Sequence, residues 1–146
     1  MTGDDTIGGP IDWWTLSPQA RAVILAGLAD WVRDLVRTFQ IPWTEIPSWW
    51  YRHEAFVHEL LALKQAREAM GYAPTEPEDA PLTWLHQLSL ARGRLRALRE
   101  TLGGTARECP PTDPQGWADA TDEATEWGRQ LEQYATGQMM EGYRNG

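Results

Sequence analysis

Apolar side chains recur at alternating intervals of four and three residues in this chain of 146 residues. Residues at these intervals share one face of an α-helix, because a helix turns once about every 3.6 residues. The pattern is longest at Trp84, Leu88, Ala91, Leu95, Leu98 and Leu102. No alternating pattern of useful strand length occurs, so the sequence predicts an all-α fold.

The first predicted helix begins after Ser17, a favourable N-cap residue followed by proline, and stops before Pro42. The second follows the aromatic segment around residues 47–50 and ends at Gly71, a typical residue just past a helix. Its apolar stripe consists of Phe56, Leu60, Leu63 and Met70.

The third predicted helix starts around residues 79–82 and ends at Gly103, and a fourth, weaker one spans about 117–135. We therefore expect a small three-helix core with a peripheral fourth helix and disordered termini. The expected domains are a helical core, 11-116, and a peripheral acidic helix with a flexible tail, 117-146. The side chains that we expect to be buried together are Leu28, Trp31, Leu60, Leu63, Leu88 and Leu95.

Nine tryptophans are more than a core of this size is expected to enclose. Aromatic side chains and arginine are enriched where proteins bind one another, so a protein partner is expected. The other interpretation is that the tryptophans belong to the core. The aromatic connector and the start of the second helix supply the expected partner-binding residues, which are Trp43, Trp49, Trp50, Arg52 and His53.

The net charge of −8 argues against wholesale binding of nucleic acid. The third helix nevertheless carries a stripe of arginines, Arg92, Arg96 and Arg99, which could follow a phosphate backbone. A nucleic-acid-associated accessory or regulatory protein is therefore one alternative. The other interpretation is structural: the stripe is solvated, or it faces the acidic fourth helix.

Two histidines begin the second helix, but His53 and His58 are five residues apart. A zinc-protease motif requires histidines four apart on one helix face. A metal-dependent enzyme that uses Glu54, His58 and His86 is a further alternative, although we expect no metal and no cofactor. Cys109 lacks a local catalytic motif and reads as an ordinary loop cysteine. The sequence therefore assigns no catalytic residue and favours a non-enzymatic protein.

The single cysteine suits a reducing compartment, and the first ten residues do not resemble a signal peptide. The longest apolar run is far shorter than the roughly 20 residues that span a bilayer. We therefore expect a cytoplasmic protein without a membrane partner.

An ordered series of motifs covers roughly residues 20 to 116. The series contains Trp31, Pro47-Ser48-Trp49-Trp50, His53, Glu59-Leu60-Leu61-Ala62-Leu63, Trp84, Leu95 to Leu98, Leu102-Gly103 and Glu108-Cys109-Pro110. It resembles an actinobacterial all-α domain family of unknown function that is carried on plasmids, integrative conjugative elements and phages. The resemblance implies a mobile genetic element and a cytoplasmic location, and it implies no established reaction.

The chain departs from the family pattern at three places. Ser48 stands where members tend to have cysteine, Glu54 stands where they have proline, and no histidine follows Cys109 closely. If a cysteine and histidine cluster binds metal in relatives, this chain is expected to have lost it. The leading hypothesis is therefore a non-enzymatic helical protein-interaction module, an accessory protein of plasmid transfer or of a phage.

Overall fold

A computed structural model describes residues 9–103, 109–110, 116–119 and 122–145. These residues form helical elements and no β-strand, which confirms the all-α prediction. In chain order the elements are η1 (Trp13–Thr15), α1 (Pro18–Phe39), η2 (Trp50–Arg52), α2 (Glu54–Ala66), η3 (Arg67–Gly71), α3 (Ala80–Leu102) and α4 (Asp122–Asn145).

The ends of α1 follow from local chemistry. The Ser17 side chain accepts a hydrogen bond from the backbone N–H of Ala20 and thereby caps the first turn. Gln40 ends the helix in the left-handed conformation, with φ of 51°, and Pro42 follows. A proline disfavours helical backbone in the residue before it, so the predicted stop is confirmed.

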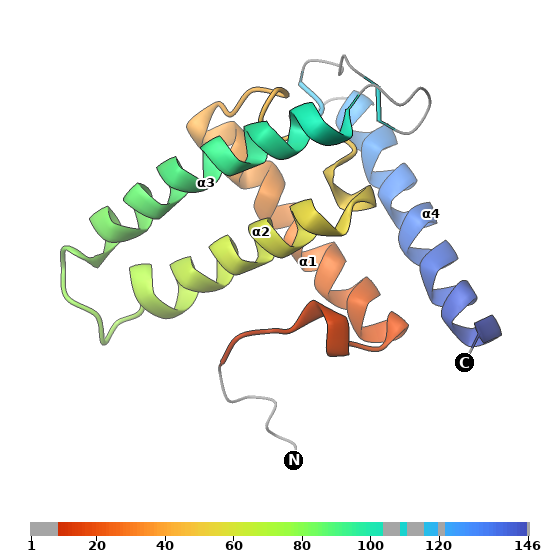
Figure 1. The fold of residues 1–146 in the computed structure, drawn as a ribbon, viewed down its shortest axis with the longest axis horizontal. Helices are drawn as coiled ribbons and strands as arrows, with labels where there is room; N and C mark the ends of the chain where they lie inside the picture. Colours follow the sequence, from red (N-terminus) through yellow and green to blue (C-terminus); the bar gives the residue numbers. More distant parts are fainter. Residues whose placement is uncertain (1–8, 104–108, 111–115, 120–121, 146) are drawn as a thin grey trace.

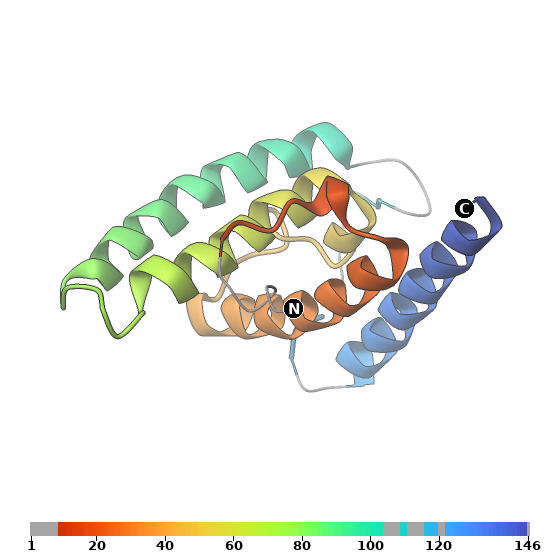
Figure 2. The same ribbon diagram turned by 90° about the horizontal axis from the view of Figure 1, so that it is seen from below.

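The α2 helix lies between α3 and α1, as the view in Figure 2 shows. Helices α2 and α3 run side by side as a hairpin, whereas α1 crosses behind them (Figure 1). Of the six residues predicted to share the core, five are buried and Trp31 is half-buried. The predicted core of three helices is therefore confirmed, with Trp31 at its edge.

Helix α4 contributes more to the core than the sequence suggested. Trp127 and Leu131 are buried, and so are Trp117 and Ala118 just before the helix. One hydrophobic cluster thus contains residues from both sides of residue 116, so the predicted boundary at 117 does not separate two packing units. The predicted flexible tail is also wrong over residues 137–145, because these residues continue α4. The expected disorder of residues 1–8 lies outside the described residues.

The arginine stripe of α3 does not face the acidic fourth helix, because α4 packs mainly against α1 (Figure 1). The Nε1 group of Trp127 donates a hydrogen bond to the Ser48 carbonyl oxygen, with a nitrogen–oxygen distance of 2.7 Å. Its ring lies 4.9 Å from that of Trp117. Among the described residues, these aromatic contacts of Trp127 link α4 to the core.

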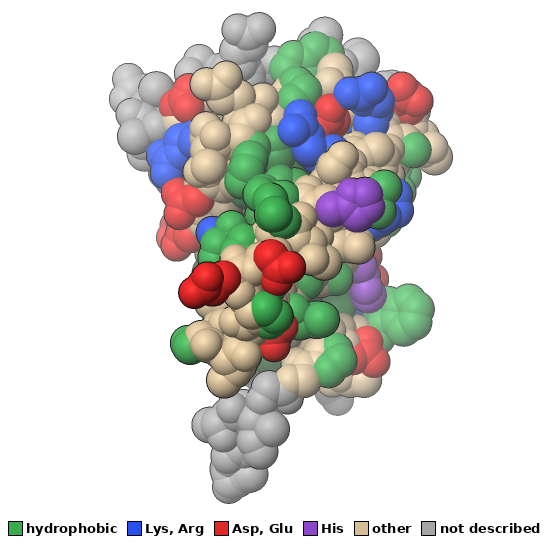
Figure 3. Space-filling model, turned by 90° about the vertical axis from the view of Figure 1, so that its left-hand side faces the viewer, with side chains coloured by type: hydrophobic (Ala, Val, Ile, Leu, Met, Phe, Trp, Pro, Cys, Tyr) green, Lys and Arg blue, Asp and Glu red, His purple; other side chains and the backbone are tan. Residues whose placement is uncertain are grey.

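The end of the second predicted helix is a π-helical turn, η3. A π turn holds one more residue than an α turn and shifts the apolar stripe around the axis. Met70, a member of the predicted apolar stripe, is therefore 64% exposed, whereas Gly71 is buried. This turn and the following loop form the end of the molecule in Figure 3, where hydrophobic and acidic side chains lie side by side.

Gly71 is expected to tolerate no side chain. A Cβ atom there would lie 2.9 Å from Cβ of Trp84, so Gly71→Ala should lower the free energy of unfolding by about 1–3 kcal/mol. Gly93 is the matched control: it lies exposed inside α3, and a Cβ there meets nothing within 4 Å. Gly93→Ala should stabilise the protein by about 0.5–1 kcal/mol. Urea unfolding measures the change in the free energy of unfolding for each variant. Equal changes for Gly71→Ala and Gly93→Ala would contradict the close packing at Gly71.

Among the helices that the structure describes, none combines the length and the apolar character needed to cross a membrane.

Candidate functional site

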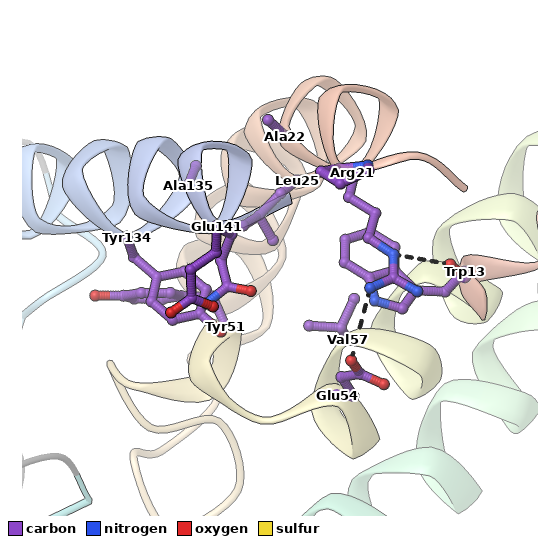
Figure 4. A pocket seen from close by; sticks show the side chains of 12 residues that line it. Trp13, Arg21, Ala22, Leu25, Tyr51, Glu54, Val57, Tyr134, Ala135 and Glu141 are labelled. Carbon is purple, nitrogen blue, oxygen red and sulfur yellow. Dashed lines mark hydrogen bonds and ion pairs between the residues drawn. The ribbon is translucent and has the colours of Figure 1, made fainter. Parts of the chain in front are cut away.

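A pocket of about 240 Å³ opens between α1, α2 and α4 (Figure 4). Its lining combines apolar, aromatic and charged side chains. The lining residues are Trp13, Pro18, Arg21, Ala22, Leu25, Tyr51, Glu54, Val57, Tyr134, Ala135, Gln138 and Glu141. Helix α4 supplies part of the wall, so the pocket exists only when α4 is docked.

The short helix η1 turns Trp13 into the pocket wall. The Asp12 carboxylate accepts a hydrogen bond from the Trp14 backbone N–H and caps η1. This turn leaves Trp13 6% exposed and its neighbour Trp14 73% exposed. Two adjacent tryptophans thus have opposite environments, and only the first lines the pocket.

Arg21 lies across the Trp13 indole (Figure 4), and its guanidinium carbon is 5.3 Å from the ring centre. Its Nε group donates a hydrogen bond of 3.0 Å to the Trp13 carbonyl oxygen. A terminal nitrogen lies 3.9 Å from a Glu54 carboxylate oxygen. Cation–π contact and the hydrogen bond together hold this cation at the pocket wall.

The Trp13 indole Nε1 is buried and has no hydrogen-bond partner among the described residues. Nearly all buried donors in folded proteins have a partner, because an unpaired one loses its hydration without compensation. The Nε1 atom is itself covered by protein, so Trp13 lines the pocket with other atoms of the residue.

Tyr51 and Tyr134 form the opposite wall, with ring centres 5.4 Å apart (Figure 4). The Arg52 guanidinium carbon lies 5.3 Å from the Tyr51 ring and 5.9 Å from the Tyr134 ring. Burial raises the pKa of Tyr51, and Arg52 opposes this shift in part. Tyr51 is therefore a neutral phenol at physiological pH, able to form hydrogen bonds but poorly suited to act as a base.

The phenol of Tyr51 is expected to titrate above its ordinary pKa of 10.0. Because the folded-state pKa is raised, the stability linked to the neutral phenol is complete below pH 10 and is lost as pH rises through the folded pKa. Tyr51→Phe should remove a step above that pKa from an ultraviolet titration and make unfolding less sensitive to alkali. A Tyr51 step at or below the ordinary pKa would contradict this expectation.

The predicted partner-binding residues do not share one surface. Trp49 and Trp50 are buried, so their side chains are part of the core and cannot meet a partner in this fold. Trp43 is half-buried beside Arg99. Arg52 and His53 are half-buried as well, and Arg52 contacts both tyrosines of the pocket. The sequence did not predict this burial, because Trp49 and Trp50 lie in an irregular connector, where apolar residues follow no helical period.

His53 caps α2 through its backbone, as its carbonyl accepts the N–H groups of Phe56 and Val57. Its side-chain Nε2 is within hydrogen-bonding contact of the Cys109 sulfur. Trp49 lies edge-on to the His53 ring and donates its Nε1 hydrogen to the Pro110 carbonyl, at 3.3 Å. Cys109 is therefore a buried partner of His53 and not an isolated loop residue. The contact spans 56 positions of sequence, so no local motif could reveal it.

The arginines of α3 are engaged with side chains of this same chain. Glu45, whose side chain is 4% exposed, accepts hydrogen bonds from Arg92 at 2.6 Å and from Arg96 at 2.7 Å. Arg99 is buried between the rings of Trp43 and Trp49, at 5.1 and 5.4 Å from their centres. The nucleic-acid alternative stays a prediction, and these contacts do not favour it.

The residues of the metal-enzyme alternative lie in different surroundings. Glu54 faces Arg21, His58 packs against the ring of Trp14, and His86 is exposed on α3. Within the described ranges, no three side chains of histidine, cysteine, aspartate or glutamate are placed to hold a metal ion. The arrangement therefore gives that alternative no site.

Comparison with protein-family models, curated proteins and solved structures found no match to this chain.

Proposed function

We propose that this protein is a non-enzymatic protein-interaction module and that a partner docks at the pocket between α1, α2 and α4. The observation that carries this proposal is the cation–π contact of Arg21 with the Trp13 indole in the pocket wall. Opposite it lie two tyrosines, and arginine, tryptophan and tyrosine are residue types that are enriched at protein interfaces.

Binding suits the lining better than catalysis does. Tyr51 is held neutral by burial, and Arg21 is held by Trp13. Glu54 and Glu141 are exposed at the rim, where water solvates their charge. The buried part of the lining offers aromatic faces and one arginine, which suit the binding of a partner side chain.

The biological setting is proposed from the motifs alone. The series from Trp31 to Pro110 resembles a domain family that is carried on mobile genetic elements, so we propose an accessory role in plasmid transfer or in a phage, in the cytoplasm. Cys109 is a free thiol, which suits that reducing compartment.

The proposal is tested by affinity capture from the native host with three full-length baits. Gln138→Trp should block the pocket, because Gln138 is an exposed lining residue of α4. Gln130→Trp is the matched control, since Gln130 is exposed on the same helix and does not line the pocket. The expected partner is retained by the unaltered protein and by Gln130→Trp, and is lost with Gln138→Trp. Equal retention by all three baits would place the interface elsewhere, and no specific capture would contradict an interaction module.

A further inference from the structure

A second groove lies between η3 and the first turns of α3, at the end of the helical hairpin that faces the viewer in Figure 3. It has a volume of about 220 Å³ and shares no lining residue with the pocket between α1, α2 and α4. Met70, Ala80 and Trp84 supply apolar lining, and Glu76 and Asp79 supply carboxylates from the connecting loop. The groove therefore combines apolar surface with negative charge.

Apolar side chains around this groove stay open to solvent. The side chains of Met70 and Leu82 are 64% and 68% exposed, and Tyr72 is 46% exposed. Leu82 belongs to the first turn of α3, which also supplies Ala80 to the groove. Exposed apolar side chains that gather at one place on a soluble protein mark an interaction site. The volume of the groove admits one apolar side chain of the size of leucine.

The carboxylates of the connecting loop are not neutralised by this chain. None of the ion pairs among the described residues includes Glu76, Glu78 or Asp79, and all three side chains are exposed. By contrast, the neighbouring Glu68 pairs with Lys64 at 2.9 Å. Three unpaired negative charges within four residues of sequence attract a positively charged partner.

The loop is held in shape before a partner arrives. Pro74 and Pro77 restrict its backbone, because the proline ring fixes φ. The backbone N–H of Glu76 donates to the Ala73 carbonyl and that of Ala80 donates to the Pro77 carbonyl, both at 3.0 Å. A loop that is ordered in the free protein loses less conformational entropy when a partner binds.

The charge of this surface selects among the possible occupants. Nucleic acid, an anionic membrane or a second copy of this chain, with its net charge of −8, would each bring further negative charge. A metal ion has no site among the described residues, because no three acidic, histidine or cysteine side chains there are placed to share one. Arg67, the nearest arginine in the sequence, lies over the Tyr72 and Trp84 rings, at 3.9 and 5.3 Å from their centres. The occupant that fits is a polypeptide with spaced positive charges.

We propose that this groove is a second docking surface, which binds a lysine- or arginine-rich segment of a partner protein through one apolar side chain. The apolar side chain enters the groove beside Met70, and the flanking cations of the segment lie near Glu76, Glu78 and Asp79. A buried apolar anchor provides most of the affinity, whereas exposed charges provide specificity and faster association. The surface is separate from the pocket of the proposed function, so the inference goes beyond that function and does not rest on it.

The test uses the full chain with ¹³C-labelled methionine methyl groups, of which the sequence has four. The Met70 signal reports on the groove, and the signal of Met140, which is exposed on α4, is the internal control. Each signal is assigned from its loss in Met70→Leu or Met140→Leu. The probes are acetyl-Lys-Lys-Leu-Lys-Lys-amide, the same peptide with serine in place of leucine, and the same peptide with glutamate in place of every lysine.

The leucine peptide is expected to shift the Met70 signal and to leave the Met140 signal in place. The serine peptide should bind about tenfold or more weakly, because it loses the burial of the leucine side chain. The glutamate peptide should shift neither signal, since its charge is repelled by the loop. Added salt should weaken the leucine peptide, because exposed charges are screened.

Two tryptophan variants locate the peptide. Gln87 is an exposed lining residue of α3, so Gln87→Trp should fill the groove and weaken the leucine peptide by about tenfold or more. Gln138→Trp is the matched control, because it fills the pocket between α1, α2 and α4 instead. It should leave the affinity for the peptide unchanged. Thermal unfolding of each variant checks that the fold is kept.

Two double variants test the charges. Glu76→Gln with Asp79→Asn should weaken the leucine peptide by a few-fold to about tenfold, since each exposed ion pair contributes little. Glu100→Gln with Glu132→Gln removes the same charge from exposed positions that do not line the groove. This matched control should change the affinity by less than about twofold, because distant exposed charges are screened.

Several results would overturn the assignment. No shift of Met70 with any peptide, or equal affinity for the leucine and serine peptides, would contradict an apolar anchor in the groove. Equal shifts of Met70 and Met140, or loss of binding in Gln138→Trp alone, would place the peptide elsewhere. A chain that sediments as a dimer, and as a monomer after Gln87→Trp, would assign the groove to a second copy. The capture experiment of the proposed function depends on Gln138, so either proposal can fail without the other.

Discussion

Replacement of Trp50 by alanine is expected to lower the free energy of unfolding by about 3–5 kcal/mol. The Trp50 side chain is 0% exposed and packs edge-on against Tyr51. Its removal would leave a cavity in the connector that joins α1 to α2, in addition to the lost burial of the ring. Domains are stable by only about 5–15 kcal/mol, so this variant should unfold at a much lower urea concentration.

Trp14→Ala is the matched control for Trp50→Ala. Trp14 has the same side chain, but it is 73% exposed and its described ring contact is with His58. Its replacement should change the free energy of unfolding by no more than about 0.5 kcal/mol. If the two variants lose similar stability, Trp50 does not occupy the core.

The double variant Arg92→Met with Arg96→Met is expected to lose about 3 kcal/mol of stability. It would leave the buried carboxylate of Glu45 without either of its two arginine partners. This loss of stability is at the lower end of the range expected when a buried ion pair is broken. The reason is that the Arg92 and Arg96 side chains are themselves 34% and 59% exposed. Urea unfolding at neutral pH measures it.

Adding Glu45→Met to the double variant should restore most of the lost stability. The buried charge is then gone, and apolar side chains of similar volume can replace a buried ionic cluster with little cost. A triple variant that is less stable than the double variant would contradict this account, since the unpaired charge would not be the cause of the loss. Arg94→Met is a further control: Arg94 pairs with Glu59 on the exposed face, where ion pairs contribute about 0–1 kcal/mol.

The helices of the core follow from local features of the sequence. The four–three spacing sets the buried faces of α1, α2 and α3, and Ser17 and Pro42 set the limits of α1. These features act within one turn or a few turns of the backbone, so the sequence is sufficient to predict them. The π turn that exposes Met70 was not predictable in this way, because it ends at Gly71, which packs closely on Trp84 of another helix.

The candidate site depends on contacts between distant segments. Tyr134 joins Trp13, Arg21 and Tyr51 only after α4 has docked against α1. In the sequence, Tyr134 belongs to an apolar stripe, and Arg21 is one of many charged surface residues. Neither pattern indicates a pocket. A polar side chain on an amphipathic helix can face open solvent, or it can line a pocket that several helices enclose, and its spacing in the sequence is the same in both cases.

The sequence by itself determined the helical class, the apolar faces of three helices and the ends that capping and proline impose. The tertiary structure decided which tryptophans are buried, which acid neutralises the arginines of α3, and which face of the core α4 covers. The physical reason is the range of each effect. Helical period and capping act between residues a few positions apart, whereas the Glu45–Arg92 and His53–Cys109 contacts join residues 47 and 56 positions apart. Such partners are chosen by the packing of the whole chain.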